Sequence, residues 1–247
     1  MAVTKVSFEY TTETGLKSDQ VSVIIVCGGS SSRMNGVDKM FAKIGGMPVA
    51  ARTISAFEQC EGVNKILVVV KKDNLLKMQQ LCDDFKFKKV TDIVEGGNCR
   101  QRSVANGLDR VGDDVSVVLV HDGARPFVSK ACINRVIESA KNYNAATCAV
   151  KLKDTVKQIK PDGLVVATPD RNALVSVQTP QGFKTELYKN AVRLAKERLE
   201  DFTDDCSLVE FAGQSVYVVD GEYSNIKITT AEDLEYADFL LAKGEQL

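Results

Sequence analysis

Short, continuous apolar runs alternate along this chain with segments in which apolar residues recur every three or four positions. A short apolar run bounded by turn residues predicts a buried β-strand, and the wider spacing predicts an amphipathic α-helix. By this criterion the predicted strands cover residues 21–27, 66–70, 90–95, 115–121, 147–152 and 215–220.

The helical segments lie between these strands. Their apolar positions are Ala50, Ile54 and Phe57 in the first, Val104, Leu108 and Val111 in the second, Ile133, Val136, Ile137 and Ala140 in the third, and Leu187, Ala191 and Leu194 in the fourth. Pro48 suits the first helical position of the first segment. Thr230 with Asp233 predicts a capping box that opens a last helix.

Strands that alternate with helices predict an α/β fold, which is Rossmann-like, with a mostly parallel sheet and helices on both faces. Ligands of such sheets bind at the carboxyl ends of the strands. For 247 residues we expect one domain over residues 21–247, preceded by a leader over residues 1–20 that can be flexible.

Residues 150–180 depart from this alternation. Two β-rich runs flank Lys160-Pro161-Asp162-Gly163, which is a strong turn signal. The segment therefore predicts a β-hairpin arm inserted into the α/β domain. Because an isolated hairpin is marginally stable in water, we expect the arm to pack on a second subunit.

The amino-acid composition limits which partners and which cellular compartment are expected. The net charge is −1, so nothing global favours nucleic acid or an anionic membrane surface. The seven cysteines are odd in number and lack a C-x-x-C pair, which argues against disulfides and structural zinc and for a reducing compartment. The polar first twenty residues contain no secretory signal, and no apolar stretch is long enough to span a membrane. We therefore expect a cytoplasmic protein.

The first candidate site follows the strand at 21–27. That strand leads into Gly28-Gly29-Ser30-Ser31-Ser32, and the cations Arg33 and Lys39 come after it. A loop of small residues lets backbone N–H groups approach phosphates closely, and the cations can neutralise charge as bonds change. The loop matches neither the Walker A pattern nor the dinucleotide fingerprint. The alternative is a plain turn with two solvated cations.

Two further polar clusters follow strands. Residues 96–103 open a helix, and their small side chains and orphan N–H groups suit a base or a ribose; a plain connecting turn is the equally good alternative. Asp122 directly follows the strand at 115–121, where one carboxylate with substrate phosphates is enough for Mg²⁺; a turn or capping role is its alternative. His121, the only histidine of the chain, is either a general base or, as we favour, a structural residue. A zinc site is not supported.

Other polar residues have weaker signals. Asp204 and Asp205 lie in a loop-like stretch before Leu208, and serines occur without a G-x-S-x-G nucleophile elbow. The remaining members of the polar set are Thr155, Arg171, Thr179 and Lys227.

Eight runs in order, spanning roughly residues 21–240, carry a family resemblance. They are GGSSSRM with DK, GGNCRQRSV, VHDGARPF, KDTV, PDRNAL, QTPQGF, TDD and NIKIT. With these runs the chain resembles the 2-C-methyl-D-erythritol 4-phosphate cytidylyltransferases, a family of the non-mevalonate isoprenoid pathway. These enzymes join CTP to a polyol phosphate and release pyrophosphate.

The resemblance implies a role for individual residues. Nucleotide binding would fall to Cys27, Gly28, Gly29, Ser30, Ser31, Ser32, Gly96, Gly97, Arg100 and Ser103. Catalysis would fall to Arg33, Lys39, Arg171 and Lys227, of which Arg33 and Lys39 would stabilise the α-phosphoryl transition state. Polyol phosphate binding would fall to Asp122, Arg125, Thr155 and Thr179, and Asp122 would also bind Mg²⁺ or another divalent cation.

The resemblance also implies a homodimer in which the arm, with Thr155 and Arg171, reaches into the partner's site. The chain departs from the family pattern in two places. Cys27-Gly28-Gly29 stands where many members have Ala-Ala-Gly, and the leader over residues 1–20 has no family counterpart.

Other functions fit part of the pattern. Ribitol 5-phosphate cytidylyltransferases share several runs, although RQRSV and PDRNAL favour the methylerythritol enzyme. A guanylyltransferase for molybdenum cofactor matches GGSSSRM and DK alone. A non-catalytic nucleotide-binding regulator is disfavoured because Arg33, Lys39, Asp122 and Lys227 are all present.

Overall fold

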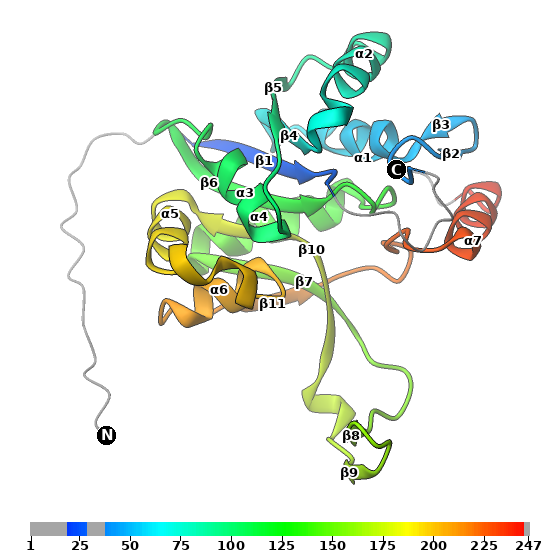
Figure 1. The fold of residues 1–247 in the computed structure, drawn as a ribbon, viewed down its shortest axis with the longest axis vertical. Helices are drawn as coiled ribbons and strands as arrows, with labels where there is room; N and C mark the ends of the chain where they lie inside the picture. Colours follow the sequence, from blue (N-terminus) through cyan, green and yellow to red (C-terminus); the bar gives the residue numbers. More distant parts are fainter. Residues whose placement is uncertain (1–18, 29–37, 245–247) are drawn as a thin grey trace.

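The computed structural model describes residues 19–28 and 38–244, and within them a seven-stranded sheet forms the centre of the molecule (Figure 1). Its strand order is β5-β4-β1-β6-β10-β7-β11. The strands are β1 (Gln20–Val26), β4 (Lys65–Val70), β5 (Val90–Glu95), β6 (Val115–Asp122), β7 (Ala145–Lys151), β10 (Val175–Lys184) and β11 (Tyr217–Asp220).

Helices connect these strands, and short elements fill the remaining connections. The helices are α1 (Val49–Glu58), α2 (Leu75–Phe85), α3 (Arg100–Leu108), α4 (Lys130–Tyr143), α5 (Thr185–Leu194), α6 (Asp205–Phe211) and α7 (Ala231–Ala242). The short strands are β2 (Lys43–Ile44), β3 (Met47–Pro48), β8 (Gln158–Ile159) and β9 (Val165–Ala167), and the 3₁₀ turns are η2 (Lys72–Asn74), η3 (Arg171–Ala173) and η4 (Lys196–Asp201).

The sheet is mostly parallel and reverses its direction of winding beside β1. β1 pairs in parallel with β4 on one side and with β6 on the other, and β10 alone runs antiparallel to its neighbours β6 and β7 in the part of the chain described. The chain leaves β1 for β4 and β5 and then crosses back to β6. The carboxyl ends of β1 and β6 therefore form the switch point at which such sheets bind ligands.

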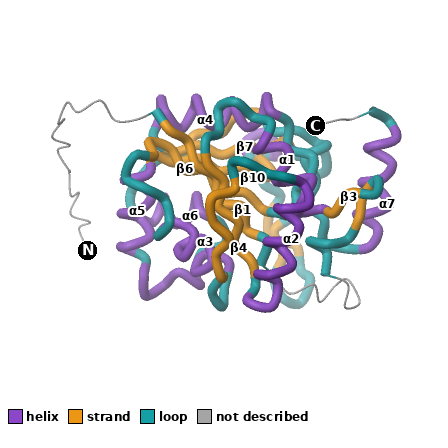
Figure 2. The backbone as a smooth tube through the Cα atoms, turned by 90° about the horizontal axis from the view of Figure 1, so that it is seen from above, coloured by secondary structure: helices purple, strands orange, loops and turns teal. Residues whose placement is uncertain are grey.

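Apolar side chains on both faces of the sheet explain the continuous apolar runs. In β1, Val23 and Ile25 pack into the core shared with α1 and α4, whereas Ile24 and Val26 pack into the core shared with α3, α5 and α6. Figure 2 shows helices on both sides of the strands. A strand buried on both faces reads as an uninterrupted apolar run, so the predicted α/β class with helices on both faces is confirmed.

The predicted elements agree with the structure to within about two residues at most ends. The capping box of Thr230 and Asp233 is confirmed at the start of α7. Pro48 is the N-cap residue of α1, not its first helical residue. The antiparallel strand β10 and the helices α2 and α6 were not among the predicted elements.

A hairpin projects from the antiparallel pair β7–β10, and we call residues 152–174 the arm (Figure 1). Its strands β8 and β9 pair antiparallel, and the predicted turn is closed by a hydrogen bond from the Gly163 N–H to the Lys160 carbonyl, with Gly163 at φ +88°. The arm is shorter than the predicted segment 150–180, because residues 175–180 belong to β10 in the main sheet.

In the described part of the chain, no helix combines the length and the hydrophobicity that crossing a bilayer requires.

Candidate active site

The ends of β1 and β6 lie side by side, with Val26 opposite Asp122. The Gly123 N–H donates to the Val26 carbonyl at 2.9 Å, and the Cys27 N–H donates to the Val69 carbonyl at 2.7 Å. A Cβ on Gly123 would overlap the Cys27 sulfur. Glycine at 123 is therefore what lets β6 turn against the first residues of the candidate phosphate loop. Gly29, Ser30, Ser31, Ser32 and Arg33 lie outside the described residues.

The glycine turn before α3 lies beside the same loop. A Cβ on Gly28 would be 4.0 Å from the Ser103 hydroxyl oxygen, which accepts the Gly97 N–H at 3.0 Å and donates to the Cys99 carbonyl at 2.8 Å. A Cβ on Gly97 would come within 2.6 Å of the Arg102 Cβ. The structure thus brings the predicted nucleotide residues Gly28, Gly97 and Ser103 together, and Gly96, whose N–H donates to Val70, adjoins them.

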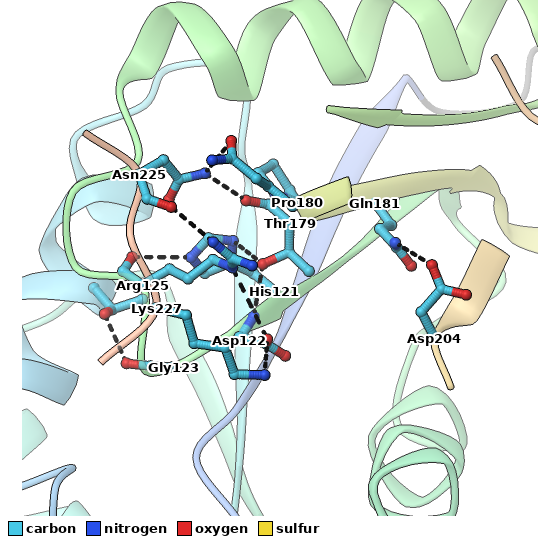
Figure 3. Close-up of polar contacts among 12 residues, drawn as sticks. His121, Asp122, Gly123, Arg125, Thr179, Pro180, Gln181, Asp204, Asn225 and Lys227 are labelled. Atoms are coloured by element: carbon cyan, nitrogen blue, oxygen red, sulfur yellow. Dashed lines mark hydrogen bonds and ion pairs between the residues drawn. The ribbon is translucent and has the colours of Figure 1, made fainter. Parts of the chain in front are cut away.

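Asp122 is buried and is surrounded by three cations (Figure 3 shows two of them). Lys227 Nζ lies 2.7 Å from Asp122 Oδ2, Arg100 Nε lies 3.2 Å from Oδ1, and Arg125 Nε lies 4.0 Å from Oδ2. Burial alone would raise the pKa of Asp122, but Arg100, Lys227 and Arg125 outweigh it and hold this pKa well below its ordinary value. The carboxylate is therefore ionised at neutral pH.

Backbone contacts hold the segments that carry Lys227 and Arg125, which both lie nearest to Oδ2 of this carboxylate. The Ile228 N–H donates to the Ala124 carbonyl at 2.8 Å, which ties the Lys227 segment to the turn after β6. Arg125 Nη1 donates to the Asn225 carbonyl at 2.7 Å. The Lys227 side chain is 40% exposed and that of Arg125 12%, so Lys227 presents its charge more fully to a ligand from solution.

His121 and Thr179 are buried behind Asp122 (Figure 3). The Thr179 hydroxyl accepts the Asp122 N–H at 3.1 Å and lies 3.0 Å from His121 Nδ1, while His121 Nε2 lies 3.2 Å from the Arg125 carbonyl. The carbonyl can only accept, so Nε2 carries the proton and Nδ1 accepts from Thr179. Burial lowers the pKa of His121 to about 3. His121 is thus neutral and both ring nitrogens are bonded within the protein, which agrees with the favoured structural role.

The Cys27 thiol is also buried behind the site. Burial, and then the neighbouring Cys82, Asp38 and Asp122, raise its pKa above the ordinary value for a cysteine. Because the thiolate is the nucleophilic form, Cys27 acts here as a small neutral side chain.

The predicted loop ends at Asp204, so the prediction is wrong for Asp205. Asp204 is the N-cap of α6, accepting the Ser207 N–H at 2.9 Å, and Asp205 is a fully buried residue of the first turn. Arg100 Nη1 lies 2.7 Å from Asp205 Oδ2, and the Tyr188 hydroxyl donates to Oδ1 at 2.6 Å. Sequence reasoning missed the contacts of Asp205 with Arg100 and with Tyr188, although the TDD run pointed at Asp205.

The remaining predicted site residues are Thr155 and Arg171 on the arm and Lys39 in the turn after the candidate phosphate loop. Thr155 and Arg171 are exposed residues of the arm, and Arg171 Nη1 donates to the Lys153 carbonyl at 2.8 Å. Lys39 lies in a turn that Asp38 stabilises, since the Asp38 carboxylate accepts from the Met40 N–H at 3.1 Å and from the Asn74 amide at 2.7 Å. The arm, with its strands β8 and β9, projects away from the sheet to which β6 and Asp122 belong (Figure 1).

The comparisons with known proteins agree on one family and on this fold. The family model described as 2-C-methyl-D-erythritol 4-phosphate cytidylyltransferase matches residues 21–243. A protein of that name from Dehalococcoides mccartyi is 44% identical over 92% of this chain and 98% of its own length, and one from Geobacillus kaustophilus is 42% identical over 89% and 96%.

Solved structures agree with the sequence relatives. The 4-diphosphocytidyl-2C-methyl-D-erythritol synthase from Anaerococcus prevotii superimposes with a TM-score of 0.81 at 32% identity, covering 90% of this chain and 96% of that one. The 2-C-methyl-D-erythritol 4-phosphate cytidylyltransferase from Thermus thermophilus has a TM-score of 0.73 at 32% identity, covering 90% and 99%. The chain therefore belongs to the 2-C-methyl-D-erythritol 4-phosphate cytidylyltransferase family.

Proposed function

We propose that this protein transfers the cytidylyl group of CTP to 2-C-methyl-D-erythritol 4-phosphate, forming 4-diphosphocytidyl-2-C-methyl-D-erythritol and pyrophosphate. The observation that carries the proposal is the group of Arg100, Arg125 and Lys227 around Asp122 at the switch point, in a chain that matches the family over residues 21–243. In the reaction, an oxygen of the polyol phosphate bonds to the α-phosphorus of CTP. The bond from that phosphorus to the β-phosphate oxygen breaks, and pyrophosphate leaves.

This reaction needs positioning and charge neutralisation more than proton transfer. A phosphate monoester is largely ionised at neutral pH and is already a nucleophile. The site matches this demand, because its buried histidine, His121, is committed to bonds with Thr179 and Arg125. No general base is required of the protein.

The cations are suited to hold the reacting phosphates. Arg100, Arg125 and Lys227 carry three positive charges, and Asp122 and Asp205 carry two negative ones, so the group has a net charge of 3 − 2 = +1. Lys227, the more exposed of the cations beside Asp122 Oδ2, is suited to bind the polyol phosphate, with Arg125 beside it. Lys39, and Arg33 outside the described residues, would neutralise charge on the CTP phosphates.

The family implies a magnesium ion, and Asp122 fits the role of its one protein ligand. The described residues contain no group of three or more His, Cys, Asp or Glu side chains that could hold a metal. Asp122 is nevertheless ionised, and magnesium is commonly held by one or two carboxylates together with phosphates and water. When bound, the ion would neutralise the charge of the triphosphate.

The arm supports a homodimer in which each site is completed by the other subunit. It projects from the sheet and exposes Ile159, Leu164, Val165 and Val166, which is unusual for a hairpin in water. Thr155 and Arg171 lie on the arm, away from Asp122 of their own chain. A two-fold pairing that buries the arm would bring these polar residues to the partner's phosphate site.

A substrate panel tests the proposed reaction. Purified protein with Mg²⁺ would be given CTP, GTP, ATP or UTP together with 2-C-methyl-D-erythritol 4-phosphate or ribitol 5-phosphate, and pyrophosphate release would be measured. We expect release with CTP and methylerythritol phosphate at a kcat/KM well above that of every other pair. Preference for ribitol 5-phosphate, or no release with any pair, would overturn the proposal.

A further inference from the structure

Arg100 is shared between two carboxylates that come from opposite sides of it. Its Nε lies 3.2 Å from Asp122 Oδ1 and its Nη1 lies 2.7 Å from Asp205 Oδ2. Asp122 ends β6 at the switch point, whereas Asp205 begins α6 and has no contact with Asp122 among the bonds of the described residues. The guanidinium group thus links α6 to the substrate-facing carboxylate.

Asp205 is held rigidly on its other side. Its side chain is fully buried, and Oδ1 accepts a short hydrogen bond of 2.6 Å from the Tyr188 hydroxyl on α5. Its backbone N–H donates to the Gln181 side-chain oxygen at 3.1 Å, and Gln181 belongs to β10 beside β6. A buried carboxylate with these partners has a single position, so it fixes the guanidinium group that it binds.

The pairing of Arg100 with Asp205 also determines which nitrogen of Arg100 contacts Asp122. With Nη1 bonded to Asp205, Arg100 offers Asp122 its Nε and contacts Oδ1, while Oδ2 contacts Lys227. Without the charge of Asp205, Asp122 would be the one strong anion left to Arg100. A guanidinium group then favours a bidentate contact with both oxygens of one carboxylate, in competition with Lys227.

We propose that Asp205, supported by Tyr188, is a positioning residue that holds Arg100 on one oxygen of Asp122 and leaves the other oxygen to Lys227 and the substrate. The proposal rests on the proposed function, because it assigns Asp205 to that same site. Asp205 itself contacts no reacting atom. It acts through Arg100, so its effect on catalysis disappears when Arg100 is absent.

A double-mutant cycle tests this role. Asp205→Asn keeps the size of the side chain and removes its charge, and Arg100→Gln removes the guanidinium group. Both variants, their combination and Asp204→Asn as the matched neighbour would be measured by pyrophosphate release with CTP and 2-C-methyl-D-erythritol 4-phosphate, and by thermal unfolding. We expect Asp205→Asn to lower kcat/KM about tenfold, as loss of a group that orients a site residue does, and Asp204→Asn to stay within about twofold.

The Asp205→Asn/Arg100→Gln double variant shows whether Asp205 positions Arg100 or only stabilises the fold. We expect Asp205→Asn to change the Arg100→Gln enzyme by less than about twofold, because the two residues act as one unit. Equal kcat/KM for Asp205→Asn and wild type, or losses that multiply in the combination, would overturn the proposal. If the wild-type enzyme itself releases no pyrophosphate, the proposed function fails instead.

A second variant covers the case in which Asp205→Asn does not fold. Tyr188→Phe removes only the hydroxyl that bonds Asp205 Oδ1 and keeps the ring that stacks on Phe183. We expect a loss of about threefold in kcat/KM that vanishes in the Arg100→Gln background. A loss that persists at the same size in that background would contradict the proposal.

Discussion

At the scale of single residues, Asp122 makes more ion pairs than any other described side chain of the site. Its two oxygens contact cations from α3, from the turn after β6 and from the segment before α7. Its backbone N–H is bonded to Thr179. A change of charge at this position therefore alters several groups at once, while the backbone that carries it stays bonded.

We expect Asp122→Asn to lose at least about a hundredfold in turnover while remaining folded, because a neutral amide can neither hold a divalent cation nor counter three positive charges. Pyrophosphate release across a Mg²⁺ titration would give the rate, and circular dichroism would report the fold. Wild-type activity should vanish with EDTA. Asp114→Asn, which loses the surface pair with Lys65, is the matched control. A near-normal rate for Asp122→Asn at saturating Mg²⁺ would refute the metal role.

Lys39 offers a second prediction at this scale. Charge on the phosphates rises toward the transition state, so we expect Lys39→Ala to lower kcat by about a hundredfold and to change KM for CTP far less. Steady-state kinetics over a range of CTP concentrations would separate the two constants. The exposed Lys43→Ala on β2 serves as the control. An effect confined to KM would make Lys39 a ground-state binding residue.

His121 makes the stability of the folded chain depend on pH. Its folded pKa of about 3 lies below the ordinary value of 6.5, so the unfolded chain binds a proton that the folded chain does not. The stabilisation is complete above pH 6.5 and is lost as the pH falls toward 3, at up to about 1.4 kcal/mol per pH unit. We expect the free energy of unfolding, measured in urea, to drop by about 2 kcal/mol between pH 7 and 5.

A variant without an ionisable side chain at position 121 isolates the contribution of His121 to the pH dependence of stability. His121→Gln should be less stable at pH 7 but should show a much flatter dependence between pH 7 and 5, since the chain has no other histidine. Parallel pH dependences for variant and wild type would show that another group is responsible.

At the scale of elements, the close meeting of β1 and β6 depends on a pair of small residues. A Cβ on Gly123 would overlap the Cys27 sulfur and lie 3.1 Å from the Val26 carbonyl oxygen. We expect Gly123→Ala to cost about 1–3 kcal/mol of stability through overpacking and to lower activity by displacing Asp122. Cys27→Ala with Gly123→Ala should recover part of the stability in urea unfolding, because the sulfur is then gone while the contact with the Val26 carbonyl oxygen remains. If the double variant is no more stable than Gly123→Ala alone, the clash lies elsewhere.

The central strands could be predicted from the sequence because burial on both faces makes them uniformly apolar. β10 could not, since its segment Val175–Lys184 carries Gln178, Thr179 and Gln181. These polar side chains are buried and bonded to partners distant in sequence, for example Thr179 to His121 and Gln181 to Asp204. A local pattern of apolar residues contains no record of such partners.

The same limit applies to the site. The order of strand ends and loops was enough to predict that Gly28, Gly97, Ser103 and Asp122 lie at one edge of the sheet, and they do. Lys227, which joins them through Asp122, was expected there only because of the family resemblance. The burial of Asp205 was missed, because it depends on Arg100, which lies 105 positions away in the sequence. Whether the predicted residues bind CTP and the polyol phosphate remains a prediction.

At the scale of the whole molecule, the proposed dimer makes a prediction about mixed subunits. We expect Arg171→Ala and Lys39→Ala enzymes, each nearly inactive, to regain activity when they exchange subunits. One site of the heterodimer carries both changes and the other carries neither, so activity should approach about half of wild type per heterodimer. Native mass spectrometry would report the exchange, and pyrophosphate release the activity. Exchange without recovery would mean that Arg171 does not serve the partner's site.

The two ends of the arm leave the sheet at paired positions, Lys151 and Val175. The ladder between β7 and β10 is therefore complete without the residues in between, and a short turn would close it. Insertions with adjacent ends are the kind that protein chains gain and lose most readily. The arm can therefore be removed without breaking the pairing of β7 with β10. A chain in which a short turn replaces residues 152–174 should fold with the same sheet and remain a monomer.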